Sequence, residues 1–169
     1  VITLKGKARE IIEAGSSYTD AGASASDMGD GELSGLIKVL GGVDTDKVGV
    51  YELFYSVKDS QGNAATQVTR RVEVMDTKGP VINLKGEVSV THEAGSSYKD
   101  AGASAVDVVD GDLSVDVVST VNTLKPGVYR VSYGVSDAAG NKAKGVVRTV
   151  RVVDTTGPVI TLNGDEVVK

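Results

Sequence analysis

The side chains of this chain that could do chemistry are mostly carboxylates, and many gather in two loop segments. The first segment, Asp27 to Glu32, reads D-M-G-D-G-E, and the second, Asp107 to Asp112, reads D-V-V-D-G-D. Carboxylates held close together repel one another unless a cation or solvent offsets their charge. Ca²⁺ binds about six to eight oxygen ligands from carboxylates, amides, carbonyls and water. These segments therefore suggest a Ca²⁺ site as one interpretation.

Further acidic residues fall in segments that would lie at the same junction if two modules stack end to end. A Ca²⁺ ion held there would stiffen the array. The candidate ligands are Glu13, Asp44, Asp46, Asp76, Asp107, Asp110, Asp112, Asp137 and Asn141. The equivalent loops of the first half of the chain carry Asp27, Asp30, Glu32, Asp59 and Asn63.

Ordinary turn chemistry explains the same residues, and it is the simpler interpretation. Asp and Asn are common in turns because their side chains hydrogen-bond to the backbone two residues on. The spacing D-x-x-D-G-D also differs from the Ca²⁺ loop of EF-hands. Asp44 and Asp46 have no acidic counterparts in the second half, which carries Asn122 to Pro126 there. Both interpretations remain open.

Catalytic constellations are absent, so we expect no enzyme activity and no catalytic residues. His92 is the single histidine, and Ile12 stands at the equivalent position of the first half. A Ser-His-acid triad in each copy is therefore impossible. A pair of carboxylates could hydrolyse a glycoside only if it were held on both sides of a sugar in a cleft. Short turns form poor clefts, so we prefer a polar turn.

Composition removes several other classes of partner. The formal net charge is −5, whereas nucleic-acid affinity comes mainly from Lys and Arg that neutralise phosphates. No apolar run reaches the ~18 residues of a membrane-spanning helix, so we expect no membrane insertion by this segment. The chain contains no Cys and therefore no disulfide or thiolate metal site.

The chain is an internal repeat. Glu13 to Tyr18 (EAGSSY) returns as Glu93 to Tyr98, and Asp76 to Ile82 returns with one change as Asp154 to Ile160. Such self-similarity is the signature of an array. We expect one module over residues 1–78, a second over 79–158, and the first strand of a truncated third over 159–169.

Strand periodicity predicts the fold of each module. Apolar residues alternate with polar ones over 51–58 and 68–74 and again over 129–135 and 146–152, and a Gly-containing turn separates the two runs each time. Short strands separated by Gly and Asp turns indicate an all-β antiparallel sandwich of about seven strands per module. Tyr51 and Tyr129 stand where a tyrosine corner caps a turn backbone.

Two arginines interrupt the apolar side of a predicted strand. Arg70 shares the parity of Val72 and Val74, and Arg148 is its copy. One interpretation is that the stem covers the core while the guanidinium reaches water. The other is a bidentate partner such as Asp20 in the first module and Asp100 in the second.

The order of the E-A-G, D-G-D-L-S, G-x-Y and D-x-x-G-N signatures resembles the immunoglobulin-like repeats of bacterial surface proteins. It is also similar to the repeats of a pesticidal crystal protein, to hyalin repeats and, more distantly, to cadherin-type modules. The resemblance implies tandem Ig-like sandwiches, an extracellular location on a bacterial surface or in a secreted protein, and no particular ligand.

We therefore expect a monomeric, non-enzymatic spacer of a bacterial surface protein or adhesin, with neighbouring modules of the array as partners. A carbohydrate- or protein-binding accessory module of a secreted enzyme, recognising a polysaccharide or cell-surface protein, is the alternative, as is a segment of a surface-layer lattice. The lack of Trp argues against a sugar-stacking platform and leaves Tyr18 and Tyr98 as the candidates for one.

Overall fold

The computed structural model describes residues 1–161 and 163–164, and these contain strands, one short 3-10 turn and no α-helix. The first repeat comprises β1 (Ile2–Leu4), β2 (Arg9–Glu13), β3 (Ala23–Asp27), β4 (Gly31–Glu32), the 3-10 turn η1 (Ser34–Leu36), β5 (Lys38–Leu40), β6 (Gly49–Ser56) and β7 (Val68–Met75). The second comprises β8 (Val81–Leu84), β9 (Ser89–Glu93), β10 (Ala103–Asp107), β11 (Gly111–Leu113), β12 (Asp116–Ser119), β13 (Gly127–Gly134) and β14 (Val146–Val153). The all-β prediction is confirmed.

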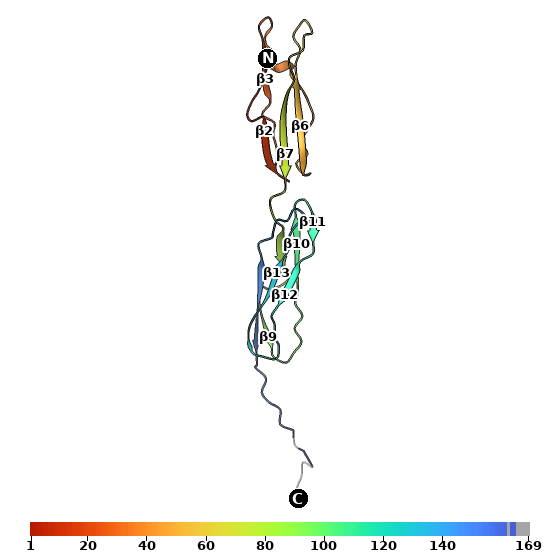
Figure 1. Cartoon of the computed structure of the whole chain (residues 1–169). Coiled ribbons are helices and arrows are strands. Elements are labelled where there is room, and N and C mark those ends of the chain that lie inside the picture. The colour runs from red at the N-terminus through yellow and green to blue at the C-terminus, as the bar shows by residue number, and fades with distance from the viewer. Residues whose placement is uncertain (162, 165–169) are drawn as a thin grey trace. The chain divides into compact units, whose positions relative to one another are not determined.

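Each repeat forms a three-stranded and a four-stranded sheet. The first repeat has the orders β1-β3-β4 and β2-β7-β6-β5, and the second has β8-β10-β11 and β9-β14-β13-β12. Figure 1 shows β2, β7 and β6 of the first repeat running side by side. Most pairs are antiparallel, but β2 pairs with β7 in parallel, as β9 does with β14. The opening segment of each repeat therefore contributes one strand to each sheet.

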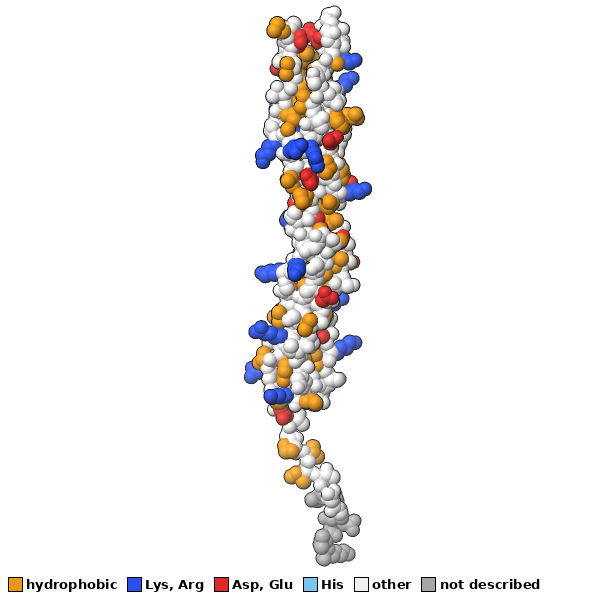
Figure 2. Space-filling model, in the orientation of Figure 1, with side chains coloured by type: hydrophobic (Ala, Val, Ile, Leu, Met, Phe, Trp, Pro, Cys, Tyr) orange, Lys and Arg blue, Asp and Glu red, His pale blue; other side chains and the backbone are white. Residues whose placement is uncertain are grey.

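The core of the first repeat lies between its two sheets. Leu53 and Tyr55 of β6 contact Ile2 of β1 and Ala25 of β3 in one apolar cluster. On β7 the buried residues are Arg70, Val72 and Val74, which is the alternation that the sequence predicts. Valine suits these strands because its branched side chain packs well on a pleated surface. Figure 2 shows that the visible surface mixes apolar and charged side chains.

Contact density divides the chain into two compact units. Unit 1 comprises Val1–Val81 together with the loop segments Val106–Leu113 and Ser136–Lys142, and unit 2 comprises Ile82–Ala105, Ser114–Val135 and Ala143–Lys169. The predicted module boundaries at 78 and 158 remain predictions. Of the predicted third-module strand over 159–169, Leu162 and residues 165–169 lie outside the described residues, and 159–161 form no assigned strand. No helix among the described residues is long and apolar enough to span a membrane.

Candidate functional site

Two loop aspartates of the second repeat are held by their own turns. The Asp107 Oδ1 atom accepts hydrogen bonds from the backbone N–H of Val109 (2.8 Å) and Asp110 (3.1 Å). The Asp137 carboxylate accepts from the Asn141 backbone N–H (2.7 Å) and from its Nδ2 (2.9 Å). Asp107 and Asp137 are only 6% and 7% exposed. Turn chemistry therefore explains their conformation, as the simpler interpretation expects, while their burial is unusual for carboxylates.

A third carboxylate, from the segment that follows β7, joins this pair. Oxygens of Asp76, Asp107 and Asp137 all lie within 4.8 Å of one another. The Asn141 Nδ2 atom also donates to the Asp76 backbone oxygen (3.2 Å), which fixes the segment beside the loop. Burial, followed by the charges of Asp107 and Asp137, raises the pKa of Asp76. The three oxygens have the spacing and the chemistry of a partial hard-cation site.

The same loops occur in the first repeat and are held by the same kinds of hydrogen bond. Asp27 accepts from Gly29 N (2.8 Å) and Asp30 N (3.2 Å), and Asp59 accepts from Asn63 N (2.7 Å) and Nδ2 (2.8 Å). These hydrogen bonds lower the pKa of both Asp27 and Asp59. Asp27 is exposed and Asp59 half-buried.

Six other predicted ligands lie outside the three-carboxylate group. Asp110 accepts from Ala138 N (2.7 Å) and thereby ties the two loops together, while Asp112 is exposed on β11. Asp44 accepts from Asp46 N (3.1 Å) in a local turn, and both are exposed. In the first repeat Asp30 accepts from Ser60 N (2.8 Å), and Glu32 from Ser34 N (2.9 Å).

The Glu13 carboxylate binds the segment that follows β7. Its carboxylate accepts from the Thr77 backbone N–H (3.1 Å) and hydroxyl (2.5 Å), and these bonds lower its pKa. Its copy, Glu93, accepts from Thr155 N (2.8 Å) and Oγ1 (2.8 Å) in the same way. Both glutamates therefore clamp the start of a connecting segment, a role that the sequence analysis missed although Glu13, Glu93 and the threonines all repeat.

A buried ion pair lies inside each repeat. Arg70 is 0% exposed and pairs with Asp20, and Arg148 is 1% exposed and pairs with Asp100. The interpretation of a bidentate acid partner is therefore correct in its choice of acid, but the contact to the acid uses one nitrogen. The other terminal nitrogen, Nη2, donates to backbone carbonyls, Lys5 and Gly22 in the first repeat and Lys85 and Gly102 in the second.

Tyrosine hydroxyls surround the acid of each pair. Tyr133 donates to Asp100 (2.5 Å) and Tyr98 does so at 2.9 Å, while Tyr55 donates to Asp20 (2.6 Å). Burial, followed by the hydrogen bond to Asp100, raises the pKa of Tyr133, so it remains a proton donor. The network satisfies a buried charge, as the low-dielectric interior requires.

The predicted tyrosine corner is present in both repeats. The Tyr51 hydroxyl donates to the Lys47 carbonyl (2.8 Å), and the Tyr129 hydroxyl donates to the Lys125 carbonyl (2.8 Å). Together with the ion-pair networks, these bonds engage the hydroxyl of every tyrosine in the chain: Tyr18, Tyr51, Tyr55, Tyr98, Tyr129 and Tyr133.

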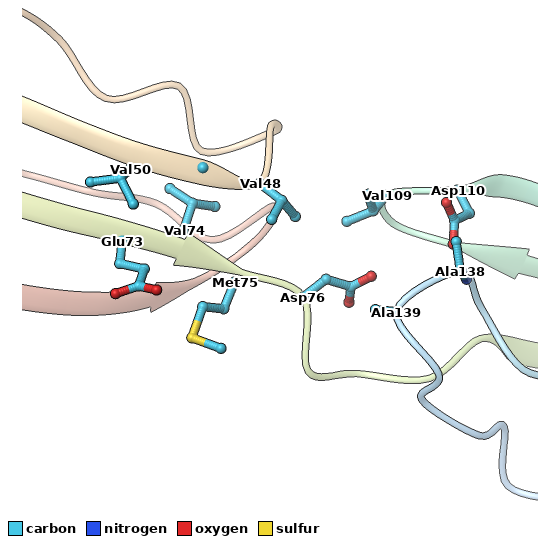
Figure 3. Close-up of a pocket in the computed structure, with 11 residues that line it drawn as sticks. Val48, Val50, Glu73, Val74, Met75, Asp76, Val109, Asp110, Ala138 and Ala139 are labelled. Carbon is cyan, nitrogen blue, oxygen red and sulfur yellow. The ribbon is translucent and has the colours of Figure 1, made fainter.

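A cavity within unit 1 lies beside Asp76. Val48, Val50 and Met75 line one side, and Val109 and Ala139 line the other. Figure 3 shows Asp76 on the segment between these two groups. The lining is mainly apolar, and its acidic members are Glu73, Asp76 and Asp110.

Comparison with known proteins identifies relatives over much of the chain. The chain is 33% identical over 136 residues to the pesticidal crystal protein Cry22Aa of Bacillus thuringiensis, covering 75% of this chain and 18% of that protein. It is 34% identical over 136 residues to hyalin of Strongylocentrotus purpuratus, covering 75% of this chain and 11% of hyalin. The chain thus spans less than a fifth of each of these relatives.

A solved structure shows the same fold. The M60 catalytic domain of Clostridium perfringens ZmpB, solved with its CBM51-1 and CBM51-2 domains, matches with a TM-score of 0.53 at 14% identity, over 92% of this chain and 31% of that one. The profile of the family described as "Bacterial surface protein, Ig-like domain" matches residues 2–74 and again 82–152. The chain belongs to this bacterial surface Ig-like family.

Proposed function

We propose that this chain is a pair of non-enzymatic spacer modules in an extracellular bacterial surface protein or adhesin. The observation that carries the proposal is the double hold on the segment after β7. Glu13 binds Thr77, and Asn141 binds the Asp76 backbone oxygen. A short segment tied at consecutive residues, and ending in Pro80, has few conformations left to it. Restricted linkers suit a module whose work is to hold another domain at a distance.

Solution scattering tests the spacer role. We expect wild-type chain to give a narrow distribution of maximum dimension, and the double variant Glu13→Ala/Asn141→Ala to give a broader one with a smaller mean dimension. Glu93→Ala is the matched control, because it releases Thr155 rather than Thr77. It should leave the distribution of maximum dimension unchanged. A wild-type chain that already samples compact and open arrangements freely would contradict the proposal.

We further propose that Ca²⁺ binds at Asp76, Asp107 and Asp137. The support is the grouping of three carboxylate oxygens within 4.8 Å, two of them on buried residues. Burial, followed by repulsion from Asp107 and Asp137, raises the pKa of Asp76. A cation would relieve this repulsion and join the segment after β7 to both loops. Water and backbone carbonyls would have to complete the coordination shell.

Thermal unfolding in chelator and in millimolar Ca²⁺ tests the site. A ligand that binds only the folded state stabilises it by about 2.7 kcal/mol at a hundredfold excess over Kd, which corresponds to a rise of several degrees in Tm. We expect Asp107→Asn to abolish the rise and Asp27→Asn, its copy in the first repeat, to keep it. An equal Tm in Ca²⁺ and in chelator, or an equal rise in Tm for the two variants, would rule out Ca²⁺ binding at this site.

The alternative of a carbohydrate-binding accessory module draws less support from the side chains. Sugar-binding platforms need an exposed aromatic face, but Tyr18 and Tyr98 are half-buried and their hydroxyls bind Asp20 and Asp100. The likeness to a structure that contains carbohydrate-binding modules is at the level of the fold. A glycan-array signal that is lost in Tyr98→Ala would favour this alternative over the spacer.

A further inference from the structure

The free edge of β2 exposes backbone groups in the first repeat. β2 lies at one end of the order β2-β7-β6-β5, beside β7 in Figure 1. The Arg71 N–H donates to the Ala8 carbonyl (2.9 Å), so Ala8 faces β7. Because backbone groups alternate in direction along a strand, the N–H and C=O groups of Arg9 and Ile11 point to the free side. Such an edge is a template for another strand.

The edge of β2 lies beside an open hollow of about 560 Å³. Arg9, Glu10 and Ile11 line the hollow from β2, and Thr19 and Ala21 line it from the segment before β3. The Ile11 side chain is 70% exposed. An added strand therefore has room beside β2 and an apolar side chain to pack against.

The charges at this edge favour an acidic partner. Arg9 lies opposite Arg71 of β7, and like charges in directly opposite positions destabilise a sheet. Both arginines are exposed, and the ion pairs of the described residues include neither of them. In the second repeat the equivalent pair is Ser89 and Thr149, which carries no charge. The basic pair is therefore a property of the first repeat alone.

A second free edge, that of β12, lies in the second repeat. β12 ends the order β9-β14-β13-β12. The Thr120 N–H donates to the Arg130 carbonyl of β13 (3.0 Å), so Thr120 faces β13. By the same alternation, the N–H and C=O groups of Val117 and Ser119 point to the free side. β12 is therefore a strand that can itself be added to the edge of another sheet.

The exposed side chains of β12 complement those of β2. Val117 lies opposite the buried Tyr133 and therefore faces the core side of the sheet. Asp116 and Val118 consequently lie on the outer face, where Val118 is 67% exposed. The equivalent strand of the first repeat, β5, has Lys38 at the position of Asp116. An acid followed two positions on by an apolar residue thus occurs at the edge of β12, whereas β5 presents a cation.

We propose that β12 of a second copy of this chain adds in parallel to the free edge of β2. Asp116 of the second copy then lies opposite Arg9. Val118 of the second copy lies opposite Ile11, and the two apolar side chains contact each other. Opposite residues of a ladder share one face, so the outer faces of the two sheets continue into each other. Antiparallel addition at the same site would place the acid opposite Ile11 and the valine opposite Arg9.

The same register pairs the free backbone groups. In a parallel ladder, a residue bonds the two neighbours of the residue opposite it. The Ile11 N–H therefore donates to the Val117 carbonyl of the second copy, and the Ile11 carbonyl accepts from its Ser119 N–H. The two edges differ, so the contact is heterologous and adds copies successively. A contact through one strand pair belongs to the weak, transient class of interfaces, so the chain is monomeric at micromolar concentration.

Sedimentation equilibrium from micromolar to millimolar protein tests the charge pairing. We expect the weight-average mass of the wild-type chain to rise with concentration. Arg9→Glu and Asp116→Arg each place like charges opposite each other, and each is expected to weaken association about tenfold. The double variant restores opposite charges and associates as wild type does, which shows that neither substitution acts by unfolding the chain. Ser89→Glu, which places a glutamate at the exposed copy of Arg9, is the control and leaves association unchanged.

Val117→Pro tests the strand addition itself. The substitution removes the N–H that would donate to the Arg9 carbonyl of the other copy. That N–H points to the free side of β12, so the pairing of β12 with β13 does not depend on it. We expect the Val117→Pro chain to stay monomeric at millimolar concentration although its charges are unchanged.

Three results would overturn the proposal. They are a wild-type chain that stays monomeric at millimolar concentration, a double charge variant that associates no better than the single variants, and a Val117→Pro chain that associates as wild type does. The proposal is independent of the spacer role, because scattering at micromolar concentration tests that role on the monomer. Repeating the series in chelator separates the cation as well, since association that persists there needs no Ca²⁺.

Discussion

At the scale of single residues, the arginine inside each repeat explains more of the fold than any other side chain. A buried charge is costly unless it is paired and hydrogen-bonded. Arg148 meets this condition through Asp100, the Tyr133 hydroxyl (2.7 Å) and the Glu87 carbonyl, to which its Nε donates at 2.8 Å. It therefore ties β14 to the segment that follows β8 and to the segment that precedes β10.

Replacement of Arg148 by lysine tests this account. A lysine keeps the charge but loses the planar fork that serves an acid and several carbonyls together. We expect Arg148→Lys to lower the free energy of unfolding by about 2–4 kcal/mol, near the cost of breaking a buried pair. Arg151→Lys, exposed on the same strand, is the control and should change it by less than about 0.5 kcal/mol. Equal effects in denaturant unfolding would refute the role.

Asp100, the carboxylate of the same pair, should determine part of the pH dependence of stability at low pH. Hydrogen bonds from Tyr133 and Arg148 outweigh the effect of burial and lower the pKa of Asp100 to about 2. A depressed carboxyl pKa contributes stability above the unfolded value, near 3.8, and this contribution is lost as pH falls toward 2. We expect a loss of about 2 kcal/mol across this window. Asp100→Asn should be less stable at pH 7 and show a flatter dependence below pH 4, and unaltered steepness would contradict the assignment.

At the scale of elements, the strands with alternating apolar residues could be predicted, and the strands held by long-range pairing could not. The alternation over β6, β7, β13 and β14 predicts both hairpins and the buried side of each strand. The separate strand β2 was not predicted, because its five residues, R-E-I-I-E, do not alternate and its partner β7 is far along the chain. Tertiary pairing decides such strands.

The candidate site could likewise be predicted only in part. The sequence placed Asp76, Asp107 and Asp137 among the candidate ligands, because loop positions in a sandwich are regular enough to bring these loops to one end. It could not exclude Asp44 and Asp46 from the group, because a local turn hydrogen bond such as that from Asp46 N to Asp44 does not tell which carboxylates lie near the turn. Nor could it reveal that Glu13 binds Thr77, since the partners are far apart in sequence.

The tyrosine corner offers a test at this scale. The Tyr129 hydroxyl holds the turn before β13 by one hydrogen bond to the Lys125 carbonyl. Tyr129→Phe removes only this bond and should lower the free energy of unfolding by about 1 kcal/mol. Because Tyr51 makes the same bond to Lys47, Tyr51→Phe should have a similar effect on the first repeat. Chemical denaturation measures both, and a neutral pair of variants would show that the turns hold without the hydroxyls.

At the scale of the whole molecule, two copies of one sequence pattern differ in how completely they satisfy their buried arginine. Arg148 uses all three nitrogens, whereas the Nε of Arg70 is buried without a hydrogen-bond partner. Glu10, at 3.8 Å from Arg70 Nη1, compensates only in part. An unsatisfied buried donor costs about 1–3 kcal/mol.

We therefore expect the first repeat to open before the second, and native-state hydrogen exchange should show lower protection for the amides of β6 and β7 than for those of β13 and β14. Arg70→Lys should then cost less than Arg148→Lys, since it breaks fewer bonds, and the reverse order of protection or of cost would mean that another feature of the first repeat outweighs its arginine.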